Sequence, residues 1–270
     1  MKKYALIGEN ISYTLSPLIH SVIYEKTGIE ASYDIIDCKR EDLPVVVEKL
    51  KEYDGFNITK PHKQNILPYL QSDELKSVNT VAIRDGKFYG YSTDGYGFSR
   101  DLKLKFGKVS GTALVLGAGG VAGVIVKELL KLGLKVYITN RTQEKAEALA
   151  FETGATACKL DEIAPDLIVN CTSCGYNEGE NPASKGGLTK NGLAVKSDKV
   201  KWVYDTIYAP PETELLKSFP LAKRSNGFGM LILQGVEADR IMCGVEIDDE
   251  TEAEIYKTAL ERIKAQEKRK

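Results

Sequence analysis

The sequence predicts an α/β protein of two domains, and three observations support this prediction. Short apolar runs alternate with amphipathic stretches along almost the whole chain of 270 residues, a length that suits two ordinary domains. From Thr112 onward the alternation becomes regular, which is typical of a doubly wound parallel sheet. A turn sequence at 84–87 indicates an antiparallel hairpin, and therefore a mixed sheet, in the first part of the chain.

The first part of the chain combines strand and helix patterns in an irregular order. Residues 33–37 alternate like a strand, whereas apolar residues within 41–53 recur at helical spacing. Pro61 suits the first position of a helix, because its fixed backbone angle costs nothing there. The expected elements are a strand at 33–37, a helix at 41–53, a strand at 55–58, a helix that Pro61 opens, and strands at 78–83 and 88–91.

The second part of the chain alternates strand and helix at regular intervals. Its expected elements are strand 112–116, helix 120–132 ending at Gly133, strand 134–139, helix 143–153, strands 166–170 and 202–205, and a short last segment near Ala222. Two further helices, at about 230–242 and 250–267, return to the first domain. We therefore place one domain at 1–97 plus 235–270 and the other at 98–234.

The composition excludes several classes of protein. The 37 basic and 38 acidic residues nearly cancel, so we expect neither nucleic acid nor an anionic membrane as a partner. No apolar run approaches the roughly 18 residues of a membrane span, and the apolar start is too short for a signal peptide. Five cysteines, an odd number, indicate reduced thiols and a cytoplasmic protein. The pair Cys171 and Cys174 has no second pair to complete a zinc site, so we expect no metal.

A glycine-rich turn joins the strand at 112–116 to the following helix. Gly117, Gly119 and Ala122 match the G-x-G-x-x-G/A spacing of a dinucleotide-binding turn, with Ala118 and Gly120 between them. The first glycine permits a tight turn, the second lets the backbone approach a pyrophosphate, and the alanine keeps helix and strand close. The pattern predicts a dinucleotide site, although such turns also occur without ligands.

The end of the next strand indicates which dinucleotide binds. A carboxylate there would hold a ribose hydroxyl and favour NAD. This chain instead has Asn140, Arg141 and Thr142, with Lys145 one helical turn later. A forked guanidinium suits a 2′-phosphate, so we predict NADP as the cofactor and a Rossmann-like domain that binds it. The alternative is an ordinary exposed arginine near a helix start.

Two charged residues in the first domain follow strands. Lys63 lies in the segment 57–63 and Asp94 in the segment 91–97. At strand ends, a lysine and an aspartate could share a cleft and handle a hydroxyl proton. Spacing alone does not distinguish this from a pair of solvated charges.

Several motifs in order connect the chain to a known family. Those of the first domain resemble G-x-P-I-x-H-S-x-S-P at 8–17, N-x-T-x-P-x-K at 57–63, G-A-x-N-T ending at Thr80, and N-T-D-x-x-G at 92–97. Those of the second resemble G-A-G-G at 117–120, N-R-T at 140–142, N-x-T-x-x-G at 170–175, D-x-x-Y-x-P-x-x-T-x-L-L at 205–216 and N-G-x-G-M-L-x-x-Q at 226–234. Together they resemble the shikimate dehydrogenase family, the NADP-dependent enzymes of aromatic amino acid biosynthesis in the chorismate pathway.

The resemblance implies a role for each matching residue. It makes Lys63 and Asp94 the catalytic acid–base pair, beside a cleft between the domains that holds substrate next to the nicotinamide. The implied substrate-binding residues are Thr14, Ser16, Thr59, Asn79, Tyr208 and Gln234. The implied cofactor-binding residues are Gly117, Ala118, Gly119, Gly120, Ala122, Asn140, Arg141, Thr142, Lys145, Thr172, Ile207, Gly229 and Met230. The implied reaction is the reversible reduction of 3-dehydroshikimate by NADPH to shikimate.

The chain departs from the family pattern at a few positions. Thr14 replaces a usual Ser, Ser92 a usual Asn, and Tyr176 a usual Met. None removes a proton carrier, so we expect an active oxidoreductase with a small-molecule substrate, as a monomer or homodimer. Two alternatives remain: an enzyme of the same family that prefers quinate or NAD, and a non-catalytic NADP-binding sensor on the same scaffold.

Overall fold

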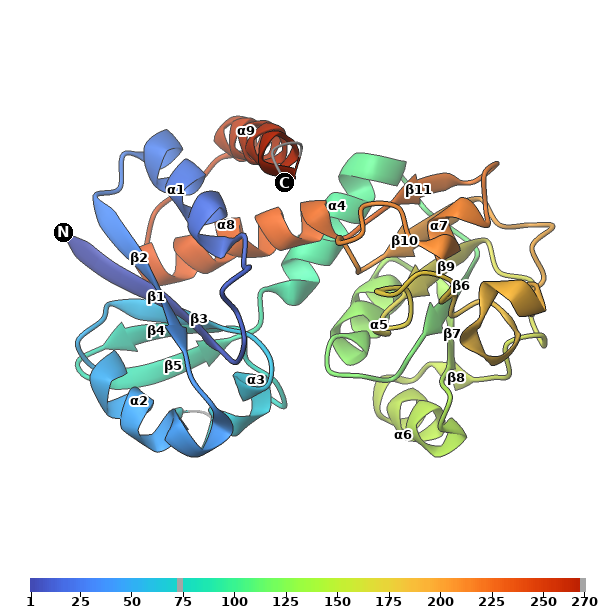
Figure 1. Ribbon diagram of the computed structural model, residues 1–270, viewed down its shortest axis with the longest axis horizontal. Helices are drawn as coiled ribbons and strands as arrows, with labels where there is room; N and C mark the ends of the chain where they lie inside the picture. Colours follow the sequence, from blue (N-terminus) through green and yellow to red (C-terminus); the bar gives the residue numbers. More distant parts are fainter. Residues whose placement is uncertain (72–74, 268–270) are drawn as a thin grey trace. The chain divides into compact units, whose positions relative to one another are not determined.

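The computed structural model describes residues 1–71 and 75–267 and contains two compact units (Figure 1). The first unit is formed by Met1–Gly97 and Leu231–Lys270, and the second by Phe98–Met230. The return to the first unit falls inside the helix α8 (Phe228–Cys243), so residues 231–234, which we placed in the second domain, belong to the first unit. An uninterrupted helix carries no sequence signal at which such a boundary could be read.

The first unit is built on a five-stranded mixed sheet. Strands β2 and β3 pair with β1 in parallel, whereas β3–β4 and β4–β5 pair antiparallel, which confirms the predicted mixed sheet. Across the sheet the order is β2-β1-β3-β4-β5. The strands are β1 (Lys2–Gly8), β2 (Ala31–Asp37), β3 (Gly55–Ile58), β4 (Thr80–Arg84) and β5 (Lys87–Tyr91).

Helices cover both faces of the first sheet (Figure 1). Ala5 and Ile7 of β1 pack in one apolar cluster with α2, whereas Tyr4 packs in another with residues of α1 and α8. Successive strand residues point to opposite faces, which places each helix against alternate side chains. The helices are α1 (Ser16–Thr27), α2 (Leu43–Leu50), α3 (His62–Asn65), the N-terminal end of α4 (Asp94–Phe106), the C-terminal part of α8, and α9 (Asp249–Glu267), with 3₁₀ turns at Arg40–Asp42 and Leu67–Tyr69.

The second unit is built on a six-stranded sheet in which all pairs are parallel. The order is β11-β10-β9-β6-β7-β8, so the chain runs outward in both directions from β6, which confirms the doubly wound, Rossmann-like prediction. The strands are β6 (Thr112–Leu116), β7 (Lys135–Thr139), β8 (Thr156–Ala157), β9 (Leu167–Asn170), β10 (Trp202–Asp205) and β11 (Lys223–Ser225). Its helices are α5 (Ala122–Lys131), α6 (Gln143–Thr153) and α7 (Glu214–Lys217), with 3₁₀ turns at Lys185–Gly187 and Thr189–Asn191.

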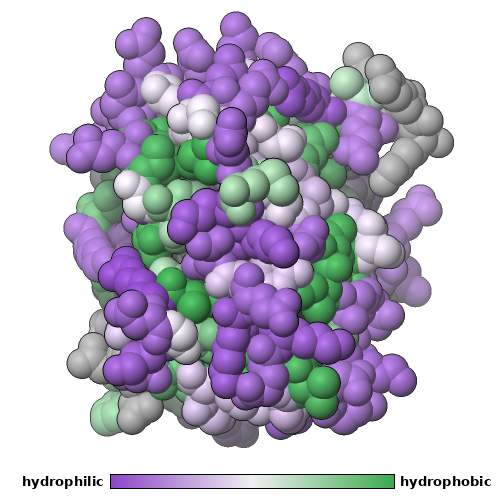
Figure 2. All heavy atoms as spheres, turned by 90° about the vertical axis from the view of Figure 1, so that its left-hand side faces the viewer, coloured by the Kyte–Doolittle hydropathy of each residue, from purple (hydrophilic) through white to green (hydrophobic). Residues whose placement is uncertain are grey.

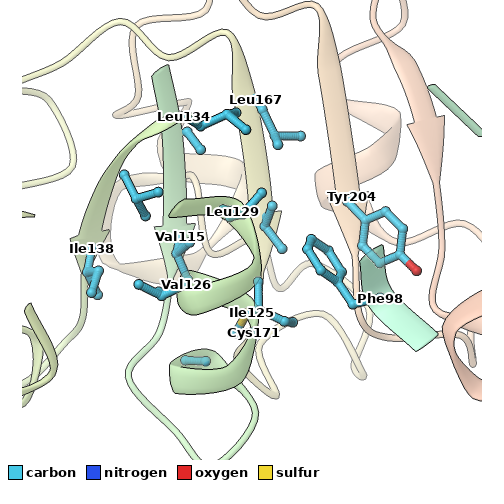
Figure 3. Close-up of a cluster of buried hydrophobic side chains, with 14 of the residues drawn as sticks. Phe98, Val115, Ile125, Val126, Leu129, Leu134, Ile138, Leu167, Cys171 and Tyr204 are labelled. Atoms are coloured by element: carbon cyan, nitrogen blue, oxygen red, sulfur yellow. The ribbon is translucent and has the colours of Figure 1, made fainter. Parts of the chain in front are cut away.

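A closely packed apolar core fixes the sheet of the second unit. Figure 3 shows Val115 of β6 beside Ile125 and Leu129 of α5, and Phe98 of α4 beside Tyr204 of β10. The rings of Phe98 and Tyr204 meet edge to face, with centroids 5.1 Å apart at an interplanar angle of 80°. These contacts hold β6, β9 and β10 in register, and the residues that end those strands therefore have fixed positions.

Several elements differ from the sequence-based expectation, which also lacked β1, β8 and α7. Helix α4 was not predicted, because Gly95 and Gly97 in its first turn are poor helix formers. The helix expected at 41–53 is a 3₁₀ turn followed by the shorter α2. Pro61 precedes α3 as its N-cap residue instead of occupying its first position.

The face of the first unit seen in Figure 2 is covered mainly by hydrophilic side chains, with small groups of apolar residues between them. Within residues 1–71 and 75–267, none of the helices combines the length and apolarity that crossing a bilayer requires.

Candidate active site

Lys63 and Asp94 form an ion pair in the first unit. Lys63 lies in α3, which follows β3 after the turn at 59–61, and Asp94 is the first residue of α4, which follows β5 after residues 92–93. Lys63 Nζ lies 2.7 Å from Asp94 Oδ2, and the two side chains are 28% and 13% exposed. Because the pair is partly buried yet reachable from solvent, a bound hydroxyl or carbonyl oxygen could exchange a proton with it.

Asn79 ties Asp94 to Gln234. Its Oδ1 accepts the Thr93 amide at 2.8 Å, which fixes the orientation of the side-chain amide. Asn79 Nδ2 then faces Asp94 Oδ1 at 3.1 Å and Gln234 Oε1 at 3.0 Å. Four of the predicted site residues, namely Lys63, Asp94, Asn79 and Gln234, are therefore brought into one hydrogen-bonded cluster, which we call the lysine–aspartate cluster. Gln234 lies in the first unit, as do the other three residues of this cluster.

The hydroxyl groups of Thr14 and Ser16 lie together at the start of α1. Thr14 Oγ1 donates to Ser16 Oγ at 3.1 Å and accepts the Ser16 amide at 3.2 Å. In the same unit, the phenol group of Tyr33 donates to Asn57 Oδ1 at 2.8 Å. This row of hydroxyl groups suits a carboxylate acceptor. Tyr33 could not be identified from the sequence, because strand alternation alone does not say which side chain reaches a site.

Thr59 lies between β3 and α3, where its amide donates to the Ile7 carbonyl at 2.9 Å. Across residues 1–71 and 75–267, no hydrogen bond joins its side chain to the lysine–aspartate cluster. Tyr208, the remaining predicted substrate residue, belongs to the second unit, where its ring lies 5.3 Å from that of Phe228.

The glycine-rich turn follows β6 in the second unit. Gly117 has a φ of +105°, and a Cβ there would lie 2.6 Å from the Thr172 methyl group. Both observations require glycine at 117. Gly119 and Gly120 are exposed, and a Cβ on Gly120 would meet no atom within 4 Å. The backbone after Gly117 therefore faces open space, into which an anion could approach the amide groups at the start of α5.

Asn140 fixes this turn from the end of the neighbouring strand β7. Its Oδ1 accepts the Ala118 amide at 3.3 Å, and its Nδ2 donates to the Thr142 carbonyl at 2.9 Å. Arg141 and Lys145 are exposed and form no side-chain hydrogen bond or ion pair within the described part of the chain. Two cationic side chains that make no ion pair among the described residues thus lie on the segment that follows β7, and this arrangement suits an anionic ligand group.

The ends of β9 and β10 are joined by two buried side chains. Asn170 Oδ1 accepts the amide of Thr172 at 2.9 Å and its hydroxyl at 2.7 Å. Asp205 Oδ1 accepts the Ile207 amide at 3.0 Å and Asn170 Nδ2 at 2.9 Å, and Thr213 donates to Asp205 Oδ2 at 2.7 Å. Asn170 and Asp205 are both 0% exposed. Burial raises the pKa of the Asp205 carboxyl to about 6, although these three bonds act in the opposite direction.

Gly229 and Met230, expected beside the nicotinamide, open α8. A Cβ on Gly229 would collide with the buried carboxylate of Asp101, which accepts the Tyr204 hydroxyl at 2.7 Å. Met230 is 8% exposed and belongs to the apolar core of the second unit. Close packing against Asp101 therefore accounts for the glycine at 229 within the protein itself.

The two cysteines Cys171 and Cys174 have different surroundings. Cys171 lies in the apolar core among α5 residues (Figure 3), whereas the Cys174 thiol donates to the Gly187 carbonyl at 3.5 Å. Burial raises the pKa of both thiols, so neither is a ready nucleophile. Within the two described ranges, no three His, Cys, Asp or Glu side chains gather as metal ligands would.

Two family models match the chain. The shikimate dehydrogenase substrate binding domain matches residues 6–81, and shikimate / quinate 5-dehydrogenase matches residues 102–174. Among curated relatives, the shikimate dehydrogenase (NADP(+)) of Methanocaldococcus jannaschii is 36% identical, over 91% of this chain and 92% of its own.

Solved structures of shikimate and quinate dehydrogenases are also similar to this chain. The shikimate 5-dehydrogenase of Thermus thermophilus, in complex with NADP(H) and shikimate, superposes with a TM-score of 0.83 at 31% identity, over 96% of this chain and 100% of that one. The quinate dehydrogenase of Corynebacterium glutamicum in complex with NAD reaches 0.78 at 28% identity, over 96% and 99%.

Proposed function

The chain belongs to the shikimate dehydrogenase family, and we propose on that basis that it catalyses the reversible reduction of 3-dehydroshikimate by NADPH to shikimate. It is an oxidoreductase that acts on a CH–OH group and uses NADP. The observation that best supports the proposed chemistry is the ion pair of Lys63 and Asp94, at 2.7 Å, which joins the segments that follow β3 and β5.

Lys63 and Asp94 move the proton of the reacting hydroxyl in this proposal. In the reducing direction, the ammonium of Lys63 donates a proton to the oxygen at C3 as it gains charge, and Asp94 holds the lysine in place. Asn79 keeps Asp94 oriented through the bond to Oδ1, so that Oδ2 remains directed at Lys63. The nicotinamide, when bound, supplies or accepts the hydride.

The remaining polar groups of the first unit bind and orient the substrate. Thr14 and Ser16, whose hydroxyl oxygens lie 3.1 Å apart, donate their protons to the substrate carboxylate, which replaces the bond from Thr14 to Ser16. Asn79 and Gln234 carry amide groups beside Asp94, where they recognise ring hydroxyls next to the reacting carbon. Thr59 and Tyr208 complete the substrate contacts.

The second unit has the groups that NADP requires. The exposed backbone at Gly119 and Gly120 admits the pyrophosphate to the amide groups that begin α5. Arg141 and Lys145 neutralise the 2′-phosphate, with Asn140 and Thr142 beside them. Gly117, Ala118 and Ala122 shape the turn, and Thr172, Ile207, Gly229 and Met230 form the nicotinamide end. On this view, residues 1–97 with the C-terminal helices serve as the substrate domain.

A spectrophotometric assay of nicotinamide reduction tests the proposal. Each substrate, shikimate or quinate, is combined in turn with NADP and with NAD. We expect the highest kcat/KM for shikimate with NADP. A preference for quinate or NAD would make the chain a relaxed member of the same family. NADP binding without turnover of either substrate would make it a non-catalytic sensor. The intact Lys63–Asp94 pair argues against a sensor, which has no use for a proton carrier.

A further inference from the structure

Asp205 is a buried acid to which the sequence analysis gave no role. It ends β10 and is 0% exposed, and its carboxylate accepts three hydrogen bonds, from Ile207, Asn170 and Thr213. No lysine or arginine forms an ion pair with it in the described part of the chain. A buried carboxyl group without a cationic partner lowers stability, so a functional reason for its presence is expected.

The bonds of Asp205 link the turns that follow two neighbouring strands. β9 and β10 pair in parallel, with Asp205 opposite Asn170 at their carboxyl ends. Asp205 Oδ1 holds the Ile207 amide of its own turn, and Asn170 Oδ1 holds the Thr172 amide of the other. Since Asn170 Nδ2 also donates to Asp205 Oδ1 at 2.9 Å, neither turn can shift without the other.

The link continues to the glycine-rich turn. The Thr172 hydroxyl is held by Asn170, which directs its methyl group against the Cα of Gly117. The ends of β6, β9 and β10 therefore form one connected row. In a doubly wound sheet, ligands bind outside these carboxyl ends, where the strand order reverses. Here the order reverses at β6, with β7 on one side and β9 and β10 on the other.

We propose that Asp205 is a positioning residue for the nicotinamide half of the cofactor, holding the turns of Thr172 and Ile207 in the form that receives it. The inference rests on the proposed use of NADP. The adenosine half, with its 2′-phosphate, belongs to the other side of the reversal, where Arg141 and Lys145 follow β7. Asp205 therefore acts on one half of the dinucleotide and leaves the other half unaffected.

Calorimetric titration of the full chain with NADP⁺ and with adenosine 2′,5′-bisphosphate separates the two halves. For Asp205→Ala, we expect the affinity for NADP⁺ to fall about tenfold, as the loss of oriented turns implies, with the bisphosphate affinity unchanged. Asp205→Asn should restore NADP⁺ affinity to within about threefold, because its Oδ1 can still accept from Ile207 and Asn170. Arg141→Ala is the matched control and should weaken both ligands.

Thr213→Val provides a second variant should Asp205→Ala fail to fold. It removes the donor to Asp205 Oδ2 with little change in shape, and we expect about threefold weaker NADP⁺ binding with unchanged bisphosphate binding. Unchanged NADP⁺ affinity in either variant, or equal losses for both ligands, would overturn the assignment. Wild-type protein that binds no NADP⁺ would instead contradict the proposed function, so the two failures are distinguishable.

Discussion

In the first unit, the side chain of Asp94 bonds to those of Lys63 and Asn79, whereas in the second unit the side chains of Asn140, Asn170 and Asp205 each accept a backbone amide of a turn. The lysine–aspartate cluster is made of contacts such as Lys63 Nζ to Asp94 Oδ2 at 2.7 Å. The three residues of the second unit instead hold the amides of Ala118, Thr172 and Ile207 at 3.3, 2.9 and 3.0 Å.

This difference indicates two ways of building a site. A cluster of side chains can redistribute protons and bonds when a substrate arrives, because each group has alternative partners. Turns whose amides already donate to Asn140, Asn170 or Asp205 have their shape before a ligand binds, which lowers the cost of ordering them around the cofactor. We therefore expect substitutions in the first region to change turnover, and substitutions in the second to change cofactor affinity and stability.

Asp94→Asn should have the largest effect on turnover. The bond from Asn79 to Oδ1 can persist, but Lys63 loses its anionic partner, so we expect kcat to fall about 100-fold or more. The KM for NADP should stay within about twofold of the wild type. Steady-state kinetics measures both constants, and a loss confined to the KM for NADP would remove the distinction between the regions.

Asp205→Asn tests the second region through pH-dependent stability. The pKa of the Asp205 carboxyl is raised from 3.8 to about 6, so its ionised form destabilises the folded state by about 3 kcal/mol at most. The folded state holds the proton more tightly than the unfolded state, so wild-type stability falls as pH rises from about 4 to about 6.

The asparagine variant lacks this titration and should become more stable than the wild type at about pH 7, but not at about pH 4. Urea unfolding at the two pH values gives the difference. If the difference in unfolding free energy between variant and wild type is the same at both pH values, the carboxyl group does not titrate in the folded protein.

Arg141→Ala should weaken NADP through the loss of charge-assisted hydrogen bonds. We expect the KM for NADP to rise about 10- to 100-fold, equivalent to about 1.5–3 kcal/mol, with the KM for NAD unaffected. Because Arg141 is exposed and unpaired within the described residues, the melting temperature should not change. An equal rise in both KM values would assign Arg141 to another part of the cofactor.

Gly117→Ala should have the smallest of these effects, a loss of about 1–2 kcal/mol in unfolding free energy. Its φ of +105° is costly for alanine, and the new Cβ would lie 2.6 Å from the Thr172 methyl group. Gly120→Ala is the matched control, because its Cβ would meet nothing within 4 Å. Thermal unfolding compares them, and equal losses would refute the tight packing at Gly117.

Much of the fold could be predicted because local patterns determine it. The strands β3 and β10 coincide with the predicted ranges 55–58 and 202–205, since buried runs between turn residues have clear limits. Helix α4 was missed because tertiary packing of Phe98 and Leu102 overrides the glycines of its first turn. The unit boundary inside α8 carries no sequence signal, because no break in the helix marks it.

The candidate sites also differ in how far the sequence could predict them. The glycine-rich turn and Arg141 follow from spacing along one βαβ segment, so sequence could identify them. The contact of Lys63 with Asp94 joins residues far apart in the chain, and from the residues alone it competed with an ordinary pair of solvated charges. The link from Asp205 to Asn170 depends on which strands are neighbours in the sheet, and local spacing does not contain that information.

A single-turnover measurement with Lys63→Ala tests the central claim most directly. Enzyme loaded with NADPH is mixed with 3-dehydroshikimate, and oxidation of the nicotinamide is followed. A separate titration measures the affinity for NADP⁺. We predict a rate about 100-fold or more below the wild type, with unchanged NADP⁺ affinity and an unchanged melting temperature. A rate within about tenfold of the wild type, at saturating substrate, would contradict the role of Lys63 as the proton carrier.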